Sequence, residues 1–254
     1  MVMRAIFLLF FIIFTSASIH SEIVLPSILG TNMVLQQCSK VSFWGNADAS
    51  TMVTLKTTWD KHTYETKSDA SGKWSIILKT PTAGGPYKIV ISDGEELVLD
   101  NILVGEVWLC SGQSNMEMPV KGFRGQPVDG SHETIMSAHE KRQLRMFTVK
   151  RAHSRDFKED VEGKWLKNNS EAVSEVSAAA YYFADALQKK LDIPVGIICA
   201  SWSASVIEAW MGEEALLTFP DLKEKILRSD LSPVATLTVL FNAMIKPLEN
   251  YTIT

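Results

Sequence analysis

The sequence lacks the short motifs that mark most metal, nucleotide and nucleic-acid sites. It has no H-E-x-x-H, no C-x-x-C and no glycine-rich phosphate loop, so nothing in it implies a metal or a cofactor. It has no run of basic residues, and its formal net charge is −4, which argues against a nucleic-acid partner. Only three cysteines are present, an odd number that gives no disulfide framework.

Long apolar runs are also missing beyond the amino-terminal segment. Residues 1–19 combine one arginine, an apolar stretch from Ala5 to Phe14 and a tail of small residues, which is the layout of a secretory signal peptide. The apolar stretch is shorter than the roughly 18 residues that span a membrane, and a membrane anchor is the alternative interpretation. We expect cleavage after Ser18, which makes 1–18 the signal peptide of a secreted or periplasmic chain without a membrane partner.

Residues 22–104 favour a small β-sandwich. Short β-prone segments such as KVSFWG, STMVTLKT and PYKIVIS alternate with turns over this region, and no helical pattern interrupts them. Val41, Phe43 and Gly45 alternate with polar neighbours, which is the period of a half-buried strand. Three tryptophans could form a sugar-stacking platform or could pack within the sheets, and packing is the favoured interpretation for each of them: Trp44, Trp59 and Trp74.

After Gly105 the pattern changes to strands that alternate with helices. Three continuous apolar segments predict buried strands, namely EVWLCSG, RQLRMFTVK and PVGIICASW. Residues 174–193 have the spacing of an amphipathic helix with Ser174 as its cap. Three further helices are predicted over 206–219, 220–229 and 235–248. The predicted fold class is therefore α/β, with a three-layer domain over 105–254 whose open parallel sheet is covered on both faces.

One serine follows the first of these strands at its carboxyl end, where ligands of open α/β sheets lie. Ser114 stands where a helix is predicted to begin, so its hydroxyl would lie among backbone N–H groups and a helix dipole that can stabilise an oxyanion. Ser114 is therefore a candidate nucleophile, and helix capping explains its position equally well. Met116 replaces the second glycine of G-x-S-x-G, so the pattern differs from the nucleophile elbow.

The segment from Gly105 to Met118, GEVWLCSGQSNMEM, resembles the serine motif of the sialate O-acetylesterases, which are secreted members of the SGNH esterase superfamily. The segments LGTNMVLQQ, PTAGGPYKIVIS, VKGFRGQPV, ASWSASVIEAWM and LFNAMIKPL resemble other parts of that family in the same order. The resemblance implies an SGNH-type α/β domain in which Ser114 attacks the acetyl group of an O-acetylated sialic acid, or of another acetylated sugar, without a cofactor. It also implies that the Ser114 N–H helps to form the oxyanion hole.

Four further residues are candidates for binding the oxyanion or positioning the substrate. They are Gln113, Asn115, Ser203 and Glu208. Arg124 is a candidate partner for the carboxylate of a sugar acid, although an ordinary surface role is the favoured interpretation.

Two departures from the family pattern bear on activity. Relatives have Ser-Trp-Gly-Gly where this chain continues from Trp202 into Ser203 and Ala204, and a side chain there costs roughly 1 kcal/mol if the backbone needs a positive φ. The family pattern also continues into an Asn motif and a paired Asp and His, whereas this sequence ends at Thr254. None of the five histidines lies in an Asp-x-x-His setting: His20, His62, His132, His139 and His153.

We therefore expect the amino-terminal part of a sialate O-acetylesterase-like pattern, with an α/β domain that is truncated and an esterase that is inactive or slow without its Asp and His. The alternatives are a non-catalytic carbohydrate-binding protein and a truncated product without a function. We also expect that an apolar face of the last predicted helix lies open: Leu237, Leu240, Phe241 and Met244.

Overall fold

The structure is a computed structural model that describes residues 22–226 and 232–254, so the predicted signal peptide lies outside the described residues. No helix within these residues is long and apolar enough to cross a membrane. The strands are β1 Val34–Gln36, β2 Lys40–Asn46, β3 Met52–Thr57, β4 Thr63–Lys67, β5 Lys73–Lys79, β6 Gly84–Ser92, β7 Glu96–Gly112, β8 Leu144–Thr148, β9 Trp165–Lys167 and β10 Val195–Ser201. The helices are α1 Ser114–Glu117, α2 Ser131–Met136, α3 Ser170–Glu175, α4 Ala178–Leu191, η1 Ile207–Trp210, α5 Glu213–Leu216, η2 Pro220–Leu222, α6 Lys223–Ile226, η3 Phe241–Ile245 and η4 Lys246–Leu248.

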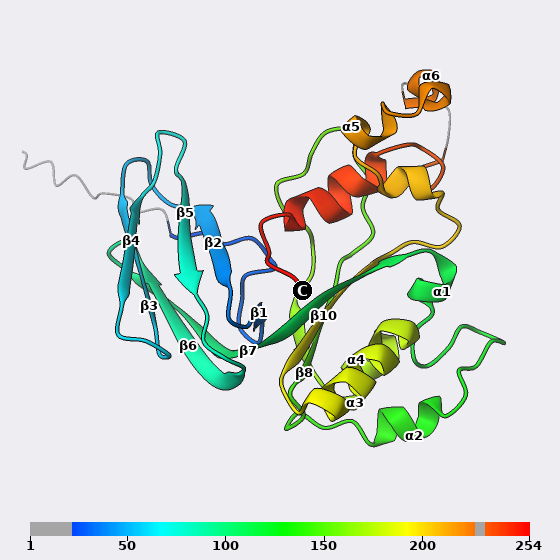
Figure 1. The fold of residues 1–254 in the computed structure, drawn as a ribbon, viewed down its shortest axis with the longest axis horizontal. Coiled ribbons are helices and arrows are strands. Elements are labelled where there is room, and N and C mark those ends of the chain that lie inside the picture. The colour runs from blue at the N-terminus through cyan, green and yellow to red at the C-terminus, as the bar shows by residue number, and fades with distance from the viewer. Residues whose placement is uncertain (1–21, 227–231) are drawn as a thin grey trace, which may run out of the picture.

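The amino-terminal half consists of strands, as predicted. One sheet contains β4, β3, β6 and the first part of β7, and β2 pairs with β5 in a separate two-stranded sheet (Figure 1). Buried residues of both sheets belong to one hydrophobic core, and Val41 and Phe43 contribute to it from alternate positions of β2. This arrangement is compatible with the β-sandwich interpretation, which stays a prediction.

A single long strand joins the two halves of the chain. The first part of β7 pairs antiparallel with β6, and its second part, from Glu106 to Gly112, pairs parallel with β10. The change occurs at Gly105, where an added Cβ would stand 2.0 Å from the Pro194 carbonyl oxygen, so only glycine fits against the neighbouring chain. The division predicted at residues 104 and 105 therefore falls inside a continuous strand rather than in a linker.

The three apolar segments of the second half form the parallel sheet that the sequence predicts. β10 lies between β7 and β8 and is parallel to both, while β9 adds an antiparallel edge beside β8. Alternate residues of β10 face opposite sides: Ile197 and Cys199 pack in a core with α3 and α4, whereas Ile198 and Ala200 pack in the core that includes the carboxyl-terminal segment. Both faces of the sheet are covered (Figure 1).

The helices are shorter than the sequence predicts. The helix predicted over 174–193 is in fact α4, which begins after Ser177, and the Ser177 hydroxyl accepts a hydrogen bond from the Ala180 N–H at 3.2 Å. The prediction of Ser174 as its cap is wrong, because Ser174 belongs to the preceding α3. Beyond β10 the predicted helix over 206–219 occurs as separate short turns, and residues 227–229 of the helix predicted over 220–229 lie outside the described residues. Within the helix predicted over 235–248, helical turns run without a break from Val239 to Leu248.

The expectation of an open apolar face near the carboxyl-terminal end is also wrong. Leu237 is 6% exposed, and Leu240 and Met244 are fully buried, because this segment folds back onto the sheet and neighbouring helical turns. The last residue reaches the outer edge of β7, where the Thr254 N–H donates to the Val107 carbonyl at 2.9 Å.

Candidate active site

Ser114 and Ser203 lie beyond the carboxyl ends of neighbouring parallel strands, as the sequence predicts. Gly112, the last residue of β7, is in register with Ser201, the last residue of β10. The Trp202 N–H donates to the Gly112 carbonyl at 3.1 Å and so keeps the two chains together past the ends of the strands. The two predicted site segments therefore meet at one edge of the sheet.

The Gln113 side chain holds the polar groups of Ser114. Gln113 Oε1 accepts hydrogen bonds from the Ser114 hydroxyl at 3.0 Å and from the Ser114 N–H at 3.2 Å. Gln113 is therefore the N-cap of α1 and Ser114 its first residue, so helix capping does not explain the serine. Asn115 follows as an exposed residue of the same turn.

The helix behind Ser114 is a single turn. α1 ends at Glu117, so its dipole is much smaller than that of a long helix and adds little to the stabilisation of an oxyanion. An oxyanion at this end of the strand would therefore be stabilised by backbone N–H groups. These groups must first be released from their present acceptors.

Glu117 fixes the turn of Ser114 to the loop after β10. Its Oε2 accepts a hydrogen bond from the Ser203 N–H at 2.5 Å, and its carboxylate also pairs with Arg151, which follows β8. The Arg151 guanidinium lies 5.7 Å from the centre of the Trp202 ring. The Ser203 N–H, a candidate oxyanion donor, is thus committed to a carboxylate, and its role in the oxyanion hole stays a prediction.

The backbone strain anticipated after Trp202 lies at Ala204. Ala204 has a φ of +61°, whereas Ser203 does not have a positive φ. A left-handed conformation costs a residue with a Cβ about 1–2 kcal/mol. Of the two residues that follow Trp202, Ala204 is therefore the one that the fold strains.

Glu208 lies away from the contacts that join these segments. It belongs to η1, and its backbone carbonyl accepts the Thr238 N–H at 3.1 Å. Within the described ranges no hydrogen bond or ion pair joins its side chain to Ser114 or Ser203. Its predicted positioning role stays a prediction.

No described histidine contacts the Ser114 hydroxyl, whose hydrogen bond within the described chain goes to Gln113. His153 follows β8 at the same edge of the sheet, and its ring centre lies 6.2 Å from that of Trp202. His132 is an exposed residue of α2, and His139 lies near β9, where its carbonyl accepts a hydrogen bond from Asn168. Arg124 is exposed, and its proposed contact with a sugar acid stays a prediction.

The buried cysteines pack in the core rather than serve as nucleophiles. Burial raises the pKa of the Cys110 thiol to about 11, and full burial raises that of Cys199 further. Both thiols therefore stay protonated at neutral pH and lack the thiolate that attacks an ester. No group of three or more histidine, cysteine, aspartate or glutamate residues able to hold a metal occurs in the described part of the chain.

The alternative in which three tryptophans form a sugar-stacking platform is not what the structure shows. Trp74 is 4% exposed and packs in the core, while Trp59 packs edge-on against Tyr87 and donates to the Lys79 carbonyl at 3.1 Å. Trp44 is half-buried and lines a surface cleft. Packing, the favoured interpretation, accounts for Trp59 and Trp74 but only partly for Trp44.

No protein-family model matches the chain. It is 28% identical to the sialate O-acetylesterase of Rattus norvegicus over 89% of this chain and 49% of that protein, and 29% identical to that of Homo sapiens over 89% and 46%. A crystal structure of a carbohydrate acetylesterase from Xanthomonas citri is 30% identical, with a TM-score of 0.80 over 91% of this chain and 50% of that one. These matches support the esterase family that the serine motif indicates. The chain spans about half the length of the relatives it matches.

The sequence alone does not single out two residues that connect the segments around Ser114 and Ser203, namely Glu117 and Arg151. The spacing of Glu117, three residues after Ser114, places it on the same turn, yet its contact with Ser203 depends on two strands meeting. Arg151 carries no sequence signal, because its partner lies on another element.

Proposed function

We propose that the chain is a serine acetylesterase that removes O-acetyl groups from sialic acid or from another acetylated sugar. The observation that carries the proposal is the position of Ser114, on the turn after β7 and beside the loop after β10, in a chain related to proteins named as sialate O-acetylesterase and carbohydrate acetylesterase. No cofactor is part of the proposal.

The reaction is acyl transfer in two steps. The Ser114 oxygen forms a bond to the acetyl carbon as its hydroxyl proton leaves, and the bond from that carbon to the sugar oxygen breaks. The sugar hydroxyl departs with a proton, and water then cleaves the acetyl-serine to acetate and free Ser114. The carbonyl oxygen carries negative charge in both steps, and backbone N–H groups near Ser114 would stabilise it.

Gln113 must move for this chemistry to begin. In the free chain its Oε1 accepts from both the hydroxyl and the N–H of Ser114. A substrate carbonyl that displaces Gln113 Oε1 would receive the Ser114 N–H, while Ser203 offers a second N–H if Glu117 releases it. Gln113, Asn115 and Ser203 are therefore proposed as groups that bind or position the acetyl group.

We also propose a secreted or periplasmic location, with residues 22–104 as a β-sandwich unit and 105–254 as the SGNH-like unit. The apolar stretch near the amino terminus supports export, and the change from antiparallel to parallel pairing within β7 supports the division. The partner is a small acetylated sugar rather than nucleic acid.

One observation favours a second function, a carbohydrate-binding protein without turnover. The Ser114 hydroxyl contacts Gln113 and no described histidine or carboxylate, so no base is in place to take its proton. In that case the chain binds the acetylated sugar and releases no acetate.

The experiment measures acetate release from an activated acetyl ester and from an O-acetylated sialic acid. We expect slow turnover, about 10⁴-fold or more below that of a serine esterase with a base in contact, because a missing triad base has an effect of that order. Ser114→Ala should abolish even this slow release, whereas Ser137→Ala, at an exposed serine of another segment, should leave it unchanged. Release that persists in Ser114→Ala would rule out the serine mechanism, and retained sugar binding without any release would favour the second function.

A further inference from the structure

A cleft of about 730 Å³ lies between the two-stranded sheet and the segments that follow β8 and η3, away from Ser114. None of the residues of α1 or of the loop after β10 lines it. Its walls come from β2 and β5 on one side, and from residues 157–160 and 246–250 on the other. Its volume falls within the range of about 300–1,000 Å³ that small-molecule sites occupy.

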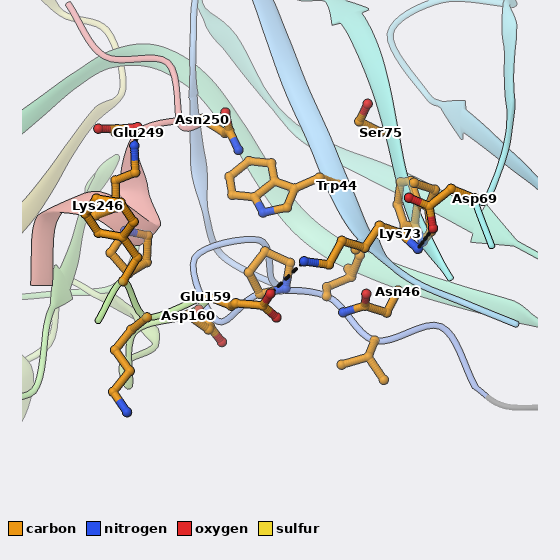
Figure 2. Close-up of a pocket in the computed structure, with 18 of the residues that line it drawn as sticks. Trp44, Asn46, Asp69, Lys73, Ser75, Glu159, Asp160, Lys246, Glu249 and Asn250 are labelled. Atoms are coloured by element: carbon orange, nitrogen blue, oxygen red, sulfur yellow. Dashed lines mark hydrogen bonds and ion pairs between the residues drawn. The ribbon is translucent and has the colours of Figure 1, made fainter. Parts of the chain in front are cut away.

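An aromatic residue stands on each side of this cleft. Trp44 projects from the outer face of β2 and is half-buried, and Figure 2 shows its indole between Asn250 and Lys73. Phe157, on the opposite wall, is 62% exposed, and the Lys246 ammonium lies 5.0 Å from its ring centre. Aromatic side chains in such positions leave apolar faces in water, which a ligand with an apolar face can cover.

The other side chains of the cleft supply neutral donors and acceptors. Asn46, Ser75 and Asn250 are exposed residues that line it beside Trp44. An amide side chain both donates and accepts hydrogen bonds, and a serine hydroxyl does the same. A site with an aromatic face and several such groups matches a ligand that has an apolar ring face and a rim of hydroxyls.

The charges of the cleft balance. Its lining includes four lysines and four carboxylates: Lys67, Lys73, Lys158 and Lys246, with Asp69, Glu159, Asp160 and Glu249. Two pairs of opposite charge are in contact, Lys73 with Glu159 and Lys246 with Glu249, each at 2.6 Å. A lining without net charge gives no preference for an anion, so the cleft does not suit the carboxylate of a sugar acid.

The walls of the cleft are held in place from behind. Asp160 Oδ2 accepts hydrogen bonds from the N–H and from the hydroxyl of Ser27, each at 2.9 Å. The Asn242 amide donates to the Arg155 carbonyl at 2.7 Å, and the Lys158 N–H donates to the Asn242 carbonyl at 3.0 Å. The cleft is therefore formed before a ligand arrives, which lowers the entropic cost of binding.

We infer that this cleft binds a neutral saccharide chain through Trp44 and Phe157, at a site separate from Ser114. Trp44 packs against the face of one sugar ring, and the amides and hydroxyls around it bind the ring's hydroxyl groups. The inference does not rest on the proposed esterase activity, because it uses none of the residues near Ser114.

The experiment titrates the chain with xylohexaose, cellohexaose, maltohexaose and mannohexaose, and with N-acetylneuraminic acid as the anionic probe, by calorimetry and tryptophan fluorescence. We expect at least one neutral hexaose to bind. Trp44→Ala should weaken that binding by about tenfold, since it removes the aromatic face that packs on the sugar ring, and Trp44→Phe should restore part of it. Phe157→Ala should weaken hexaose binding several-fold. It tests the same cleft from its opposite wall, so the result does not depend on correct folding of the Trp44 variant alone.

Two controls keep the result specific to the cleft. Ile77 lies on the same outer face of β5 as Ser75, is 54% exposed and does not line the cleft, so Ile77→Ala should leave hexaose binding unchanged. Ser114→Ala should also leave it unchanged. The inference is overturned if no neutral hexaose binds, or if the Trp44 and Phe157 variants bind as tightly as the unaltered chain. It is overturned as well if binding is lost in Ser114→Ala, an outcome that would assign the sugar to the esterase site.

Discussion

At residue 204 the chain carries a side chain where its backbone favours glycine. Ala204 has a φ of +61° on the loop that joins β10 to η1, next to the Ser203 N–H that Glu117 binds. Single residues of this kind set the geometry of a site because their neighbours cannot relax independently. Ser114 is a second residue whose neighbours fix its position, because its hydroxyl and its N–H both donate to Gln113.

Replacing Ala204 with glycine should stabilise the fold. Removing the Cβ relieves a left-handed residue, and we expect a gain of about 0.5–1 kcal/mol in the free energy of unfolding after the extra entropy of an unfolded glycine is subtracted. Ser203→Gly is the matched control: φ is not positive there, so that variant should lose about 0.5–1 kcal/mol. Urea unfolding of the two variants tests this, and a change of the same sign in both would contradict it.

The three thiols should differ in reactivity. Cys38 is exposed, whereas Cys110 and Cys199 are buried in the sheet and burial raises the pKa of Cys110 to about 11. At pH 8 a thiol-specific disulfide reagent should therefore modify one thiol per native chain rapidly, and all three after denaturation. Cys38→Ser should remove the rapid phase; a rapid phase that survives would show that a core cysteine is accessible.

At the scale of elements, the site depends on contacts between turns rather than on long helices. α1 is one turn, and it is connected to the loop after β10 through Glu117 and to the segment after β8 through Arg151. The three segments come from three neighbouring parallel strands, β7, β10 and β8. One carboxylate therefore holds together the ends of the strands that form the site.

Loss of this carboxylate should destabilise the chain more than loss of a surface ion pair. Glu117→Ala removes the acceptor of the Ser203 N–H and leaves Arg151 without its partner, so we expect a loss of about 1–3 kcal/mol. Glu175→Ala breaks an exposed pair with Lys121 and should cost less than about 1 kcal/mol. Chemical denaturation of both variants provides the measurement, and equal effects would mean that Glu117 contributes only a surface interaction.

At the scale of the whole molecule, the two halves share their core. Val34 and Leu103 of the β-rich half pack in one cluster with Phe147 and Trp165 of the second half. The Tyr251 hydroxyl donates to the Val34 carbonyl at 2.6 Å and the Trp165 Nε1 donates to the Ile28 carbonyl at 2.8 Å. These buried bonds connect segments that are far apart in the sequence, so the carboxyl-terminal segment is part of the folded core.

Stability should fall at alkaline pH in a way that depends on Tyr251. Burial raises the pKa of the Tyr251 phenol well above its ordinary value. The stability that Tyr251 contributes is therefore complete below about pH 10, the approximate pKa of the phenol in the unfolded chain. It is lost as the pH rises from there toward the pKa in the folded chain, because only the unfolded chain then releases the proton. The free energy of unfolding should decrease between pH 9 and pH 11.

Comparison with the Tyr251→Phe variant isolates the contribution of Tyr251 to the pH dependence of stability. The variant should be less stable at pH 8 by about 1 kcal/mol, since it lacks the hydrogen bond to Val34, but its stability should decline less steeply above pH 10. The slope should not vanish, because burial also raises the pKa of Tyr181. Parallel decline of the two proteins would contradict the assignment.

The sequence by itself determined where the strands lie, whether each is buried on one face or on both, and that Ser114 follows the end of a strand. Alternation along β2 and β5 and continuous apolar runs in β8 and β10 are local patterns, and each follows from whether one or both faces of a strand are buried. The tertiary structure alone decided which groups meet. The Glu117 carboxylate meets the Ser203 N–H, the Tyr251 hydroxyl meets the Val34 carbonyl, and Trp44 lines one cleft with residues of the opposite wall. It also divided the helix predicted over 206–219 into short turns and buried Leu240, because packing between distant segments outweighs the weak local preference for a helix.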